Sequence, residues 1–276
     1  YNIVKTVKQG SAVENELAEA PALSVISSGQ MKGEKWHSWL ERKPVQFTIL
    51  TTIAVAIGGV VQIVPMIVVK SNIPTISSVK PYSPLELEGR DIYIREGCNN
   101  CHSQMIRPFR SEVKRYGEYS KSGEYVYDHP FLWGSKRTGP DLMRIGGKYN
   151  DNWHFNHMWS PQRMDEKSVM PAYKWLFDNK AMDHSLIEKK MSVMVTLGVP
   201  YTDADIANAK KSIDEQSTKI EKSLYNDPDF VKSYEDSKKK AAAKGEDFVP
   251  MKDREIVALI AYLQRMGTEK KKKKAK

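Results

Sequence analysis

The feature that most constrains this 276-residue chain is an uninterrupted apolar segment near its N-terminal end. Residues 45–69, VQFTILTTIAVAIGGVVQIVPMIVV, contain no charged side chain. A helix of that length extends roughly 37 Å, enough to cross about 30 Å of bilayer hydrocarbon. Aromatic and basic side chains flank the segment, as interfacial anchors do: Trp36, Trp39, Arg42, Lys43 and Lys70. It is too long for a signal peptide, and a core helix is rarely apolar on all sides, so we predict a transmembrane helix.

Composition excludes several classes of protein. The chain is 40% hydrophobic, which is enough for a folded core and excludes wholesale disorder. Its net charge is +9, but the Lys-rich tail at 268–276 supplies six positive charges, so the remainder is only mildly basic. We therefore expect no nucleic-acid partner. With only two cysteines, the chain is not a disulfide-rich scaffold.

Both cysteines belong to one short motif that predicts a cofactor. Cys98 and Cys101 precede His102 in a C-x-x-C-H pattern, which is the attachment signature of c-type haem. Two thiols at this spacing can each form a thioether with a haem vinyl group, while the adjacent imidazole binds the iron. A redox dithiol and a metal site are the alternatives. A zinc site would need histidines from elsewhere, such as His129, His154 or His157.

A haem that carries electrons usually has a second axial ligand, which is most often methionine or histidine. Among the twelve methionines, Met170 is the best candidate because it follows the haem motif at a distance. Pro171 restricts the Met170 backbone to an extended conformation, which suits a ligand on a loop. His154 and His157 are the competing candidates, and packing or surface positions are the alternative for them.

Two further features fit a haem domain. The carbonyl of Pro140 could accept a hydrogen bond from the free imidazole nitrogen of His102 and thereby orient the ring, although a plain turn is the alternative. Gly89 and Tyr93 lie four residues apart before the motif, and Tyr262 lies near the end of the chain. A glycine permits a close helix crossing, which an aromatic pair can fill.

These observations predict an all-α fold, with one N-terminal transmembrane helix before a class I cytochrome c-like domain that carries loop insertions. Apolar residues at 256, 259, 260, 263 and 266 form one helix face at the end of this domain. Residues 103–150 are rich in Gly, Pro, Tyr and Arg, which favours a long ordered loop region. The expected division is: 1–44, N-terminal extension and interfacial segment; 45–69, membrane helix; 70–84, tether; 85–267, mono-haem domain, with a charged helical insertion at about 203–247; 268–276, Lys-rich tail.

Taken together, these stretches resemble the mono-haem, membrane-anchored subunit II of cbb3-type cytochrome c oxidase. The resemblance runs from about residue 40 to 267, outside the charged insertion. It is carried by GRDIYIREGCNNCHSQMIRPF, FLWGSKRTGPDLMRIGGKY, WHFNHMWSPQ, SVMPAYKWL and LGVPYTDADI. The C-x-x-C-H and GPDL motifs are widespread among cytochromes, whereas the ordered set that includes MPAY and LGVPYT is much more specific.

The resemblance implies that Cys98 and Cys101 hold one covalent haem c, with His102 as proximal and Met170 as distal ligand. It implies an electron relay from a cytochrome c donor or the di-haem subunit to the catalytic haem-copper subunit. Oxygen reduction and proton pumping would occur outside this chain. The N-terminal extension, the insertion and the tail depart from the usual pattern. The extension leaves open a fusion with the catalytic subunit.

The resemblance also implies some finer features. Residues 133–137 would face the catalytic subunit, near a calcium ion at the interface. Arg107 and Arg137 could pair with the haem propionates through charge-assisted hydrogen bonds, and solvated surface positions are the alternative for both.

Haem c is attached on the periplasmic side in bacteria, which predicts a single-pass protein of the inner membrane with its haem domain in the periplasm. The basic residues on the N-terminal side of the apolar segment favour the same topology. The cytochrome subunit of a nitric oxide reductase is the closest alternative function. A membrane-tethered thiol–disulfide oxidoreductase and a structural subunit with a non-transferring haem are the others.

Overall fold

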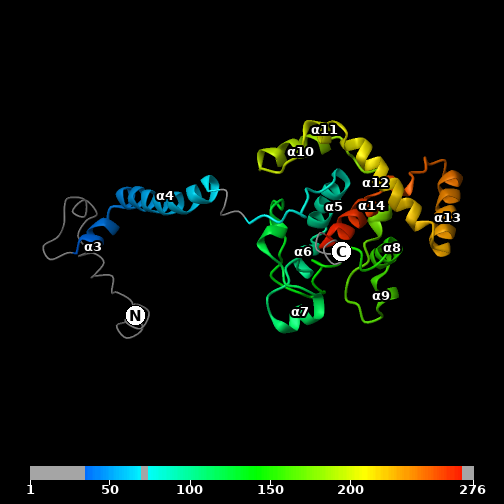
Figure 1. The fold of residues 1–276 in the computed structure, drawn as a ribbon, viewed down its shortest axis with the longest axis horizontal. Helices are drawn as coiled ribbons and strands as arrows, with labels where there is room; N and C mark the ends of the chain where they lie inside the picture. Colours follow the sequence, from blue (N-terminus) through cyan, green and yellow to red (C-terminus); the bar gives the residue numbers. More distant parts are fainter. Residues whose placement is uncertain (1–34, 70–73, 269–276) are drawn as a thin grey trace, which may run out of the picture. The chain divides into compact units, whose positions relative to one another are not determined.

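The computed structural model describes residues 35–69 and 74–268 and divides the chain into two units between residues 73 and 74. Within those described ranges every regular element is helical, which confirms the predicted all-α fold (Figure 1). The elements are α3 (Trp36–Glu41), α4 (Pro44–Val68), α5 (Pro84–Arg95), α6 (Cys98–Cys101), α7 (Arg110–Tyr116), η3 (Ser122–Tyr125), α8 (Asp151–Trp159), α9 (Pro161–Met164), η4 (Lys174–Phe177), α10 (Ile187–Thr196), α11 (Asp203–Ala207), α12 (Ala209–Leu224), α13 (Pro228–Lys244), η5 (Met251–Asp253) and α14 (Glu255–Arg265).

The first unit contains the long apolar helix α4, close to the range predicted for the membrane segment. Pro44 begins it at a position where proline costs no hydrogen bond. Pro65 lies inside the last turns, and its carbonyl accepts a hydrogen bond from the Val69 N–H at 2.9 Å. None of the residues in the span Pro44–Met66 is buried within the described structure, as expected of a helix that faces lipid.

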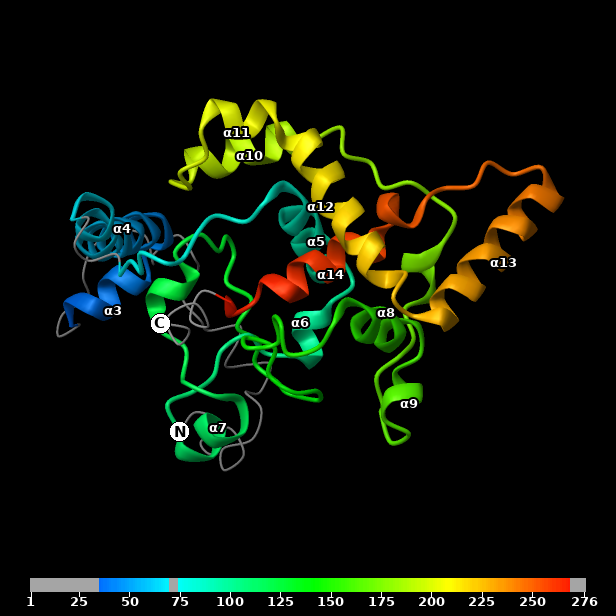
Figure 2. The same cartoon turned by 45° about the vertical axis from the view of Figure 1, so that its right-hand side comes forward.

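The second unit is organised around the crossing of α5 and α14, which lie side by side in two views (Figures 1 and 2). Gly89 faces the Ala258 carbonyl so closely that any Cβ there would overlap it. The rings of Tyr93 and Tyr262 fill the rest of the crossing, with centroids 5.4 Å apart and both side chains fully buried. The predicted glycine-mediated crossing is therefore present.

Helix α5 has a complete N-terminal cap, which explains where it begins. The Ser83 hydroxyl accepts a hydrogen bond from the Glu86 N–H, and the Glu86 carboxylate accepts one from the Ser83 N–H. The helix ends at Arg95, two residues before Gly97. Gly97 itself has a φ of 68° and begins the next turn, α6.

The charged insertion packs into the domain core. It forms α11, α12 and α13, in agreement with the predicted helices. Ile213, Ile220 and Leu224 of α12 are buried in the same hydrophobic cluster as α5 and α14. Phe230 and Tyr234 of α13 stack with ring centroids 5.6 Å apart and extend that cluster outward. The insertion therefore shares its core with the rest of the second unit.

Residues 103–150 are mostly loop, as expected, but they also contain the short helix α7 and the 3-10 turn η3. The Arg144 guanidinium pairs with Glu124 at 2.6 Å and ties η3 to the loop beyond residue 140. The predictions for 1–34, 70–73 and 269–276, which cover most of the extension, part of the tether and nearly all of the tail, lie outside the described residues.

Candidate haem site

The C-x-x-C-H motif forms a single helical turn, α6, immediately after Gly97. The His102 N–H donates to the Cys98 carbonyl at 2.9 Å, which closes the turn that carries both cysteines. Cys98 is half-buried and packs against the main core, whereas Cys101 is exposed. The two thiols are free, so both are available for thioether bonds.

His102 is oriented by a segment of the long loop region, residues 139–140. Its Nδ1 lies 2.8 Å from the Pro140 carbonyl oxygen, which can only accept, so Nδ1 carries the proton. This leaves the Nε2 lone pair free for a metal, the arrangement that hydrogen bonds from neighbouring groups impose on ligating histidines. Burial lowers the pKa of His102, which favours the neutral, ligating form. The predicted contact between His102 and Pro140 is confirmed.

Gly139 completes this arrangement because it lies directly beside the imidazole. Any Cβ at this position would overlap the His102 ring. The Gly139 N–H donates to the Cys101 carbonyl at 2.9 Å, so the same segment also holds the end of α6. No residue larger than glycine would therefore fit at position 139 beside the His102 ring.

Two polar residues, Asp141 and Arg137, hold this segment of the loop region in place. The Asp141 carboxylate accepts from the Ser103 hydroxyl at 2.6 Å and from the Met105 N–H at 2.9 Å. The Arg137 guanidinium donates to the Ser103 hydroxyl at 2.5 Å and to the Met105 carbonyl at 2.7 Å. The chain on both sides of Pro140 is thus tied directly to the residues that follow His102.

Met170 lies on a loop that α8 and α9 hold in place. The Gln162 amide donates to the Met170 carbonyl at 3.0 Å, and the Tyr173 N–H donates to the Met158 carbonyl at 2.9 Å. The Met170 side chain is half-buried and packs against the same core as Cys98. Residues 168–173 form no helix, as Pro171 indicated, and the role of Met170 as iron ligand remains a prediction.

His154 and His157, the competing ligand candidates, both lie on α8. Burial lowers the pKa of His154 to about 4, and burial together with the nearby His102 ring lowers that of His157. Both rings are therefore neutral at physiological pH. His154 Nε2 and His157 Nδ1 are buried without a hydrogen-bond partner among the described residues. Two free thiols and an open His102 Nε2 fit a covalently bound haem.

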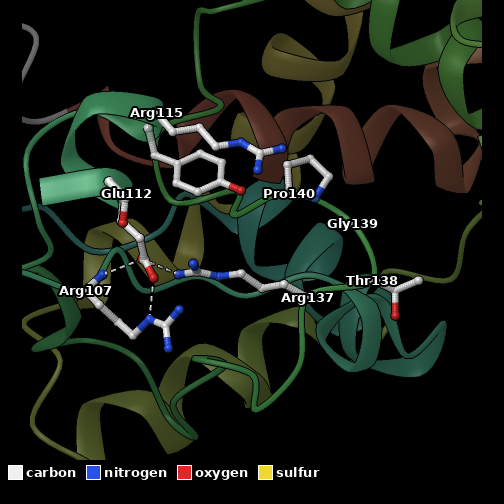
Figure 3. Close-up of a pocket in the computed structure, with 9 residues that line it drawn as sticks. Arg107, Glu112, Arg115, Arg137, Thr138, Gly139 and Pro140 are labelled. Atoms are coloured by element: carbon white, nitrogen blue, oxygen red, sulfur yellow. Dashed lines mark hydrogen bonds and ion pairs between the residues drawn. The ribbon is translucent and has the colours of Figure 1, made fainter. Parts of the chain in front are cut away.

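Arg107 and Arg137 converge on one carboxylate that the sequence alone does not single out. Glu112 of α7 accepts from the Arg107 side chain and pairs with Arg137 Nη2 at 2.8 Å (Figure 3). These two guanidinium groups lower the pKa of Glu112 to about 2, with Arg137 the larger cause. Nothing in the local sequence links residues 112 and 137, so this ion-pair cluster was not predictable from spacing. The pairing of either arginine with a haem propionate remains a prediction.

The geometry also bears on the dithiol alternative. Burial raises the pKa of the Cys98 thiol to about 12, with the nearby Glu96 as a smaller cause. Catalytic dithiols have lowered pKa values because the thiolate is the reactive form. Among the described residues, no group of three His, Cys, Asp or Glu side chains is arranged to hold a metal ion. Neither observation favours a thioredoxin-like or zinc site.

Comparison with known protein families places these residues in context. The family model for the cytochrome c oxidase mono-haem subunit, FixO, matches residues 37–270. A comparison with curated proteins gives no match. The family match spans most of the chain and includes the haem motif, the Pro140 segment, the Met170 loop and the helical insertion. The chain therefore belongs to the FixO family, the mono-haem cytochrome c subunit of cbb3-type oxidase.

Proposed function

We propose that the chain is an electron relay, which accepts electrons from a cytochrome c donor or the di-haem subunit and passes them to the haems of the catalytic haem-copper subunit. Cys98 and Cys101 would hold one haem c through thioether bonds, with His102 and Met170 as axial ligands. When bound, this haem supplies a reversible one-electron couple whose potential is raised by methionine ligation. The hydrogen bond between His102 Nδ1 and the Pro140 carbonyl, at 2.8 Å, carries the proposal.

The chain's own residues keep this site rigid, which is what electron transfer between fixed partners requires. Gly139 and Pro140 hold the proximal ring in one orientation and one tautomer. Gln162 restrains the backbone of the loop that carries Met170, the other proposed ligand. No side chain in this arrangement needs to gain or lose a proton during the transfer, and no substrate bond is made or broken in this chain.

The location follows from α4 and from where haem c is attached. We propose a single-pass protein of the bacterial inner membrane, with residues after 70 in the periplasm. A short tether from α4 would restrict the haem domain to a layer near the membrane and raise its effective concentration at the partner subunits. Contact of residues 133–137 with the catalytic subunit, with a calcium ion nearby, belongs to the same proposal.

Purification from native membranes tests this function. We expect a covalent haem that survives denaturing electrophoresis, a catalytic haem-copper subunit that co-purifies, and rapid reduction by a donor cytochrome c. The double variant Cys98→Ala/Cys101→Ala should lose the haem stain. Co-purification of a nitric oxide-reducing subunit would favour that alternative instead. A haem that donors do not reduce would leave only a structural role.

A further inference from the structure

The residues beside His102 also line a pocket that extends away from the two cysteines. Thr138, Gly139 and Pro140 line a pocket of about 500 Å³ together with residues of α7 and its flanks (Figure 3). Of the predicted haem-site residues, Pro140 and the two propionate candidates Arg107 and Arg137 line it, whereas Cys98, Cys101, His102 and Met170 do not. The remaining lining residues are Arg107, Ser111, Glu112, Arg115, Tyr116 and Arg137.

The charge of this pocket is positive. Its three arginines face a single carboxylate, Glu112, which already pairs with both Arg107 and Arg137. Arg115 contributes a further charge, and its guanidinium contacts the Tyr116 ring at 5.2 Å. Among the described residues Arg115 pairs with no carboxylate. Asp141, which does not line the pocket, also lies 3.4 Å from Arg137 Nη2, so the three arginines exceed the carboxylates paired with them by one positive charge.

The lining groups are suited to an anion with several oxygen atoms. Guanidinium groups bind phosphate and carboxylate oxygens through pairs of parallel hydrogen bonds. The hydroxyls of Ser111 and Thr138 belong to the same lining and can donate as well. The Tyr116 ring is already contacted by Arg115 and, at 5.5 Å, by Arg137, so little aromatic surface remains for an apolar ligand.

We propose that this pocket binds a free multivalent anion of the phosphate class and that the bound anion lowers the potential of the haem. The coupling rests on the proposed function and runs through Gly139 and Pro140. These residues line the pocket and also contact the His102 ring. A negative charge at this position stabilises the ferric state, which carries one more positive charge than the ferrous state. By linkage, the oxidised protein must bind the anion more tightly than the reduced protein.

Equilibrium dialysis with inorganic pyrophosphate tests the binding site at constant ionic strength. The protein is the full-length, haem-bearing chain in detergent, and the dialysis is repeated on the assembled oxidase. We expect saturable binding in both, about tenfold weaker in Arg115→Gln because one charged partner is lost. Arg110→Gln is the matched control, since Arg110 lies on the same helix but does not line the pocket. It should bind pyrophosphate like the wild type.

Redox titration of the isolated chain tests the coupling. The midpoint potential should fall with pyrophosphate over the same concentration range as binding, and the shift should require higher concentrations in Arg115→Gln. Absence of saturable binding, equal weakening in Arg110→Gln, or binding without a shift in potential would each overturn the proposal. Failure of the proposed function looks different: the chain would then carry no covalent haem, and dialysis would still report on the pocket.

Discussion

At the scale of single residues, the site depends on atoms that the haem motif does not contain. The motif identifies the two thiols and the imidazole, but Pro140 and Gly139 determine how the imidazole is oriented. The Pro140 carbonyl was anticipated, because a proline after the motif offers an acceptor at a rigid turn, whereas the close fit of Gly139 against the ring was not. The ion pair between Arg137 and Glu112 could not be anticipated, because it joins residues 25 positions apart across a loop without periodicity.

The role of Met170 can be tested by removing its sulfur while keeping its volume. In Met170→Leu we expect the covalent haem to remain, because the thioethers and His102 are untouched. Its midpoint potential should fall and oxidase turnover should slow, since the thioether ligand raises the potential. Met164→Leu is the control, because Met164 lies exposed on α9. Absorption bands of the sulfur–iron bond that persist in Met170→Leu would assign the distal ligand to another residue.

The Glu112 cluster predicts a pH dependence of stability. The folded-state pKa of this carboxylate is about 2, below its ordinary value of 4.5. A lowered pKa stabilises the fold above pH 4.5, and this contribution is lost as the pH falls towards 2. Glu112→Gln should therefore reduce the free energy of unfolding at neutral pH by about 1–3 kcal/mol and flatten its acid dependence. Urea titrations at several pH values measure both effects.

The control for Glu112 is an exposed carboxylate with a long ion pair. Glu215 lies 3.9 Å from Lys211 on the surface of α12. Glu215→Gln should change the free energy of unfolding by less than about 0.5 kcal/mol and leave its acid dependence intact. If both variants behaved alike, the Glu112 cluster would contribute nothing beyond ordinary surface charge.

At the scale of helices, the elements that periodicity predicts are those with a buried face. The apolar spacing from 256 to 266 predicts α14, and its side chains from Ile256 to Leu263 are indeed buried. Helix α7 is only seven residues long and Glu112 is its one buried residue, so the local sequence does not separate it from a loop. Its position is supported by the long-range pairing of Glu112 with Arg137.

The charged insertion also separates what local sequence pattern predicts from what it does not. Its helices were predictable from local pattern, because Ile213, Ile220 and Leu224 recur at helical spacing. The structure places those residues in the core shared with α5 and α14, and packing between distant segments cannot be derived from local pattern.

The crossing of α5 and α14 is the element-scale contact most sensitive to one added carbon. Gly89→Ala would place a methyl group on the Ala258 carbonyl, and the helices would have to separate. We expect a loss of about 1–3 kcal/mol in the free energy of unfolding of the haem-bearing chain. Gly58→Ala in α4 is the control, because nothing lies within 4 Å of the position that its methyl group would take. Gly89→Ala with the stability of the wild type would contradict the close packing of this crossing.

At the scale of the whole molecule, anchoring and haem binding are assigned to different units. Residues 1–73 contain the apolar helix, whereas every residue proposed to hold the haem lies within 74–276. The sequence anticipated this separation, because an uncharged segment and a C-x-x-C-H motif require different surroundings.

This division predicts that the two functions can be separated. A chain that begins at Pro74 behind an export signal retains α5, α14 and the whole haem site, so it should carry covalent haem and keep the spectrum of the full chain. It should leave the membrane fraction, because α4 is absent. Electron delivery to the oxidase should then require much higher concentrations of this chain, since a tether converts encounter into an intramolecular event. Haem staining of membrane and soluble fractions, with turnover titrated against added domain, measures both effects. A truncated chain that still fractionates with membranes and supports full turnover at stoichiometric levels would show that contacts of the haem domain, not α4, hold it in the complex.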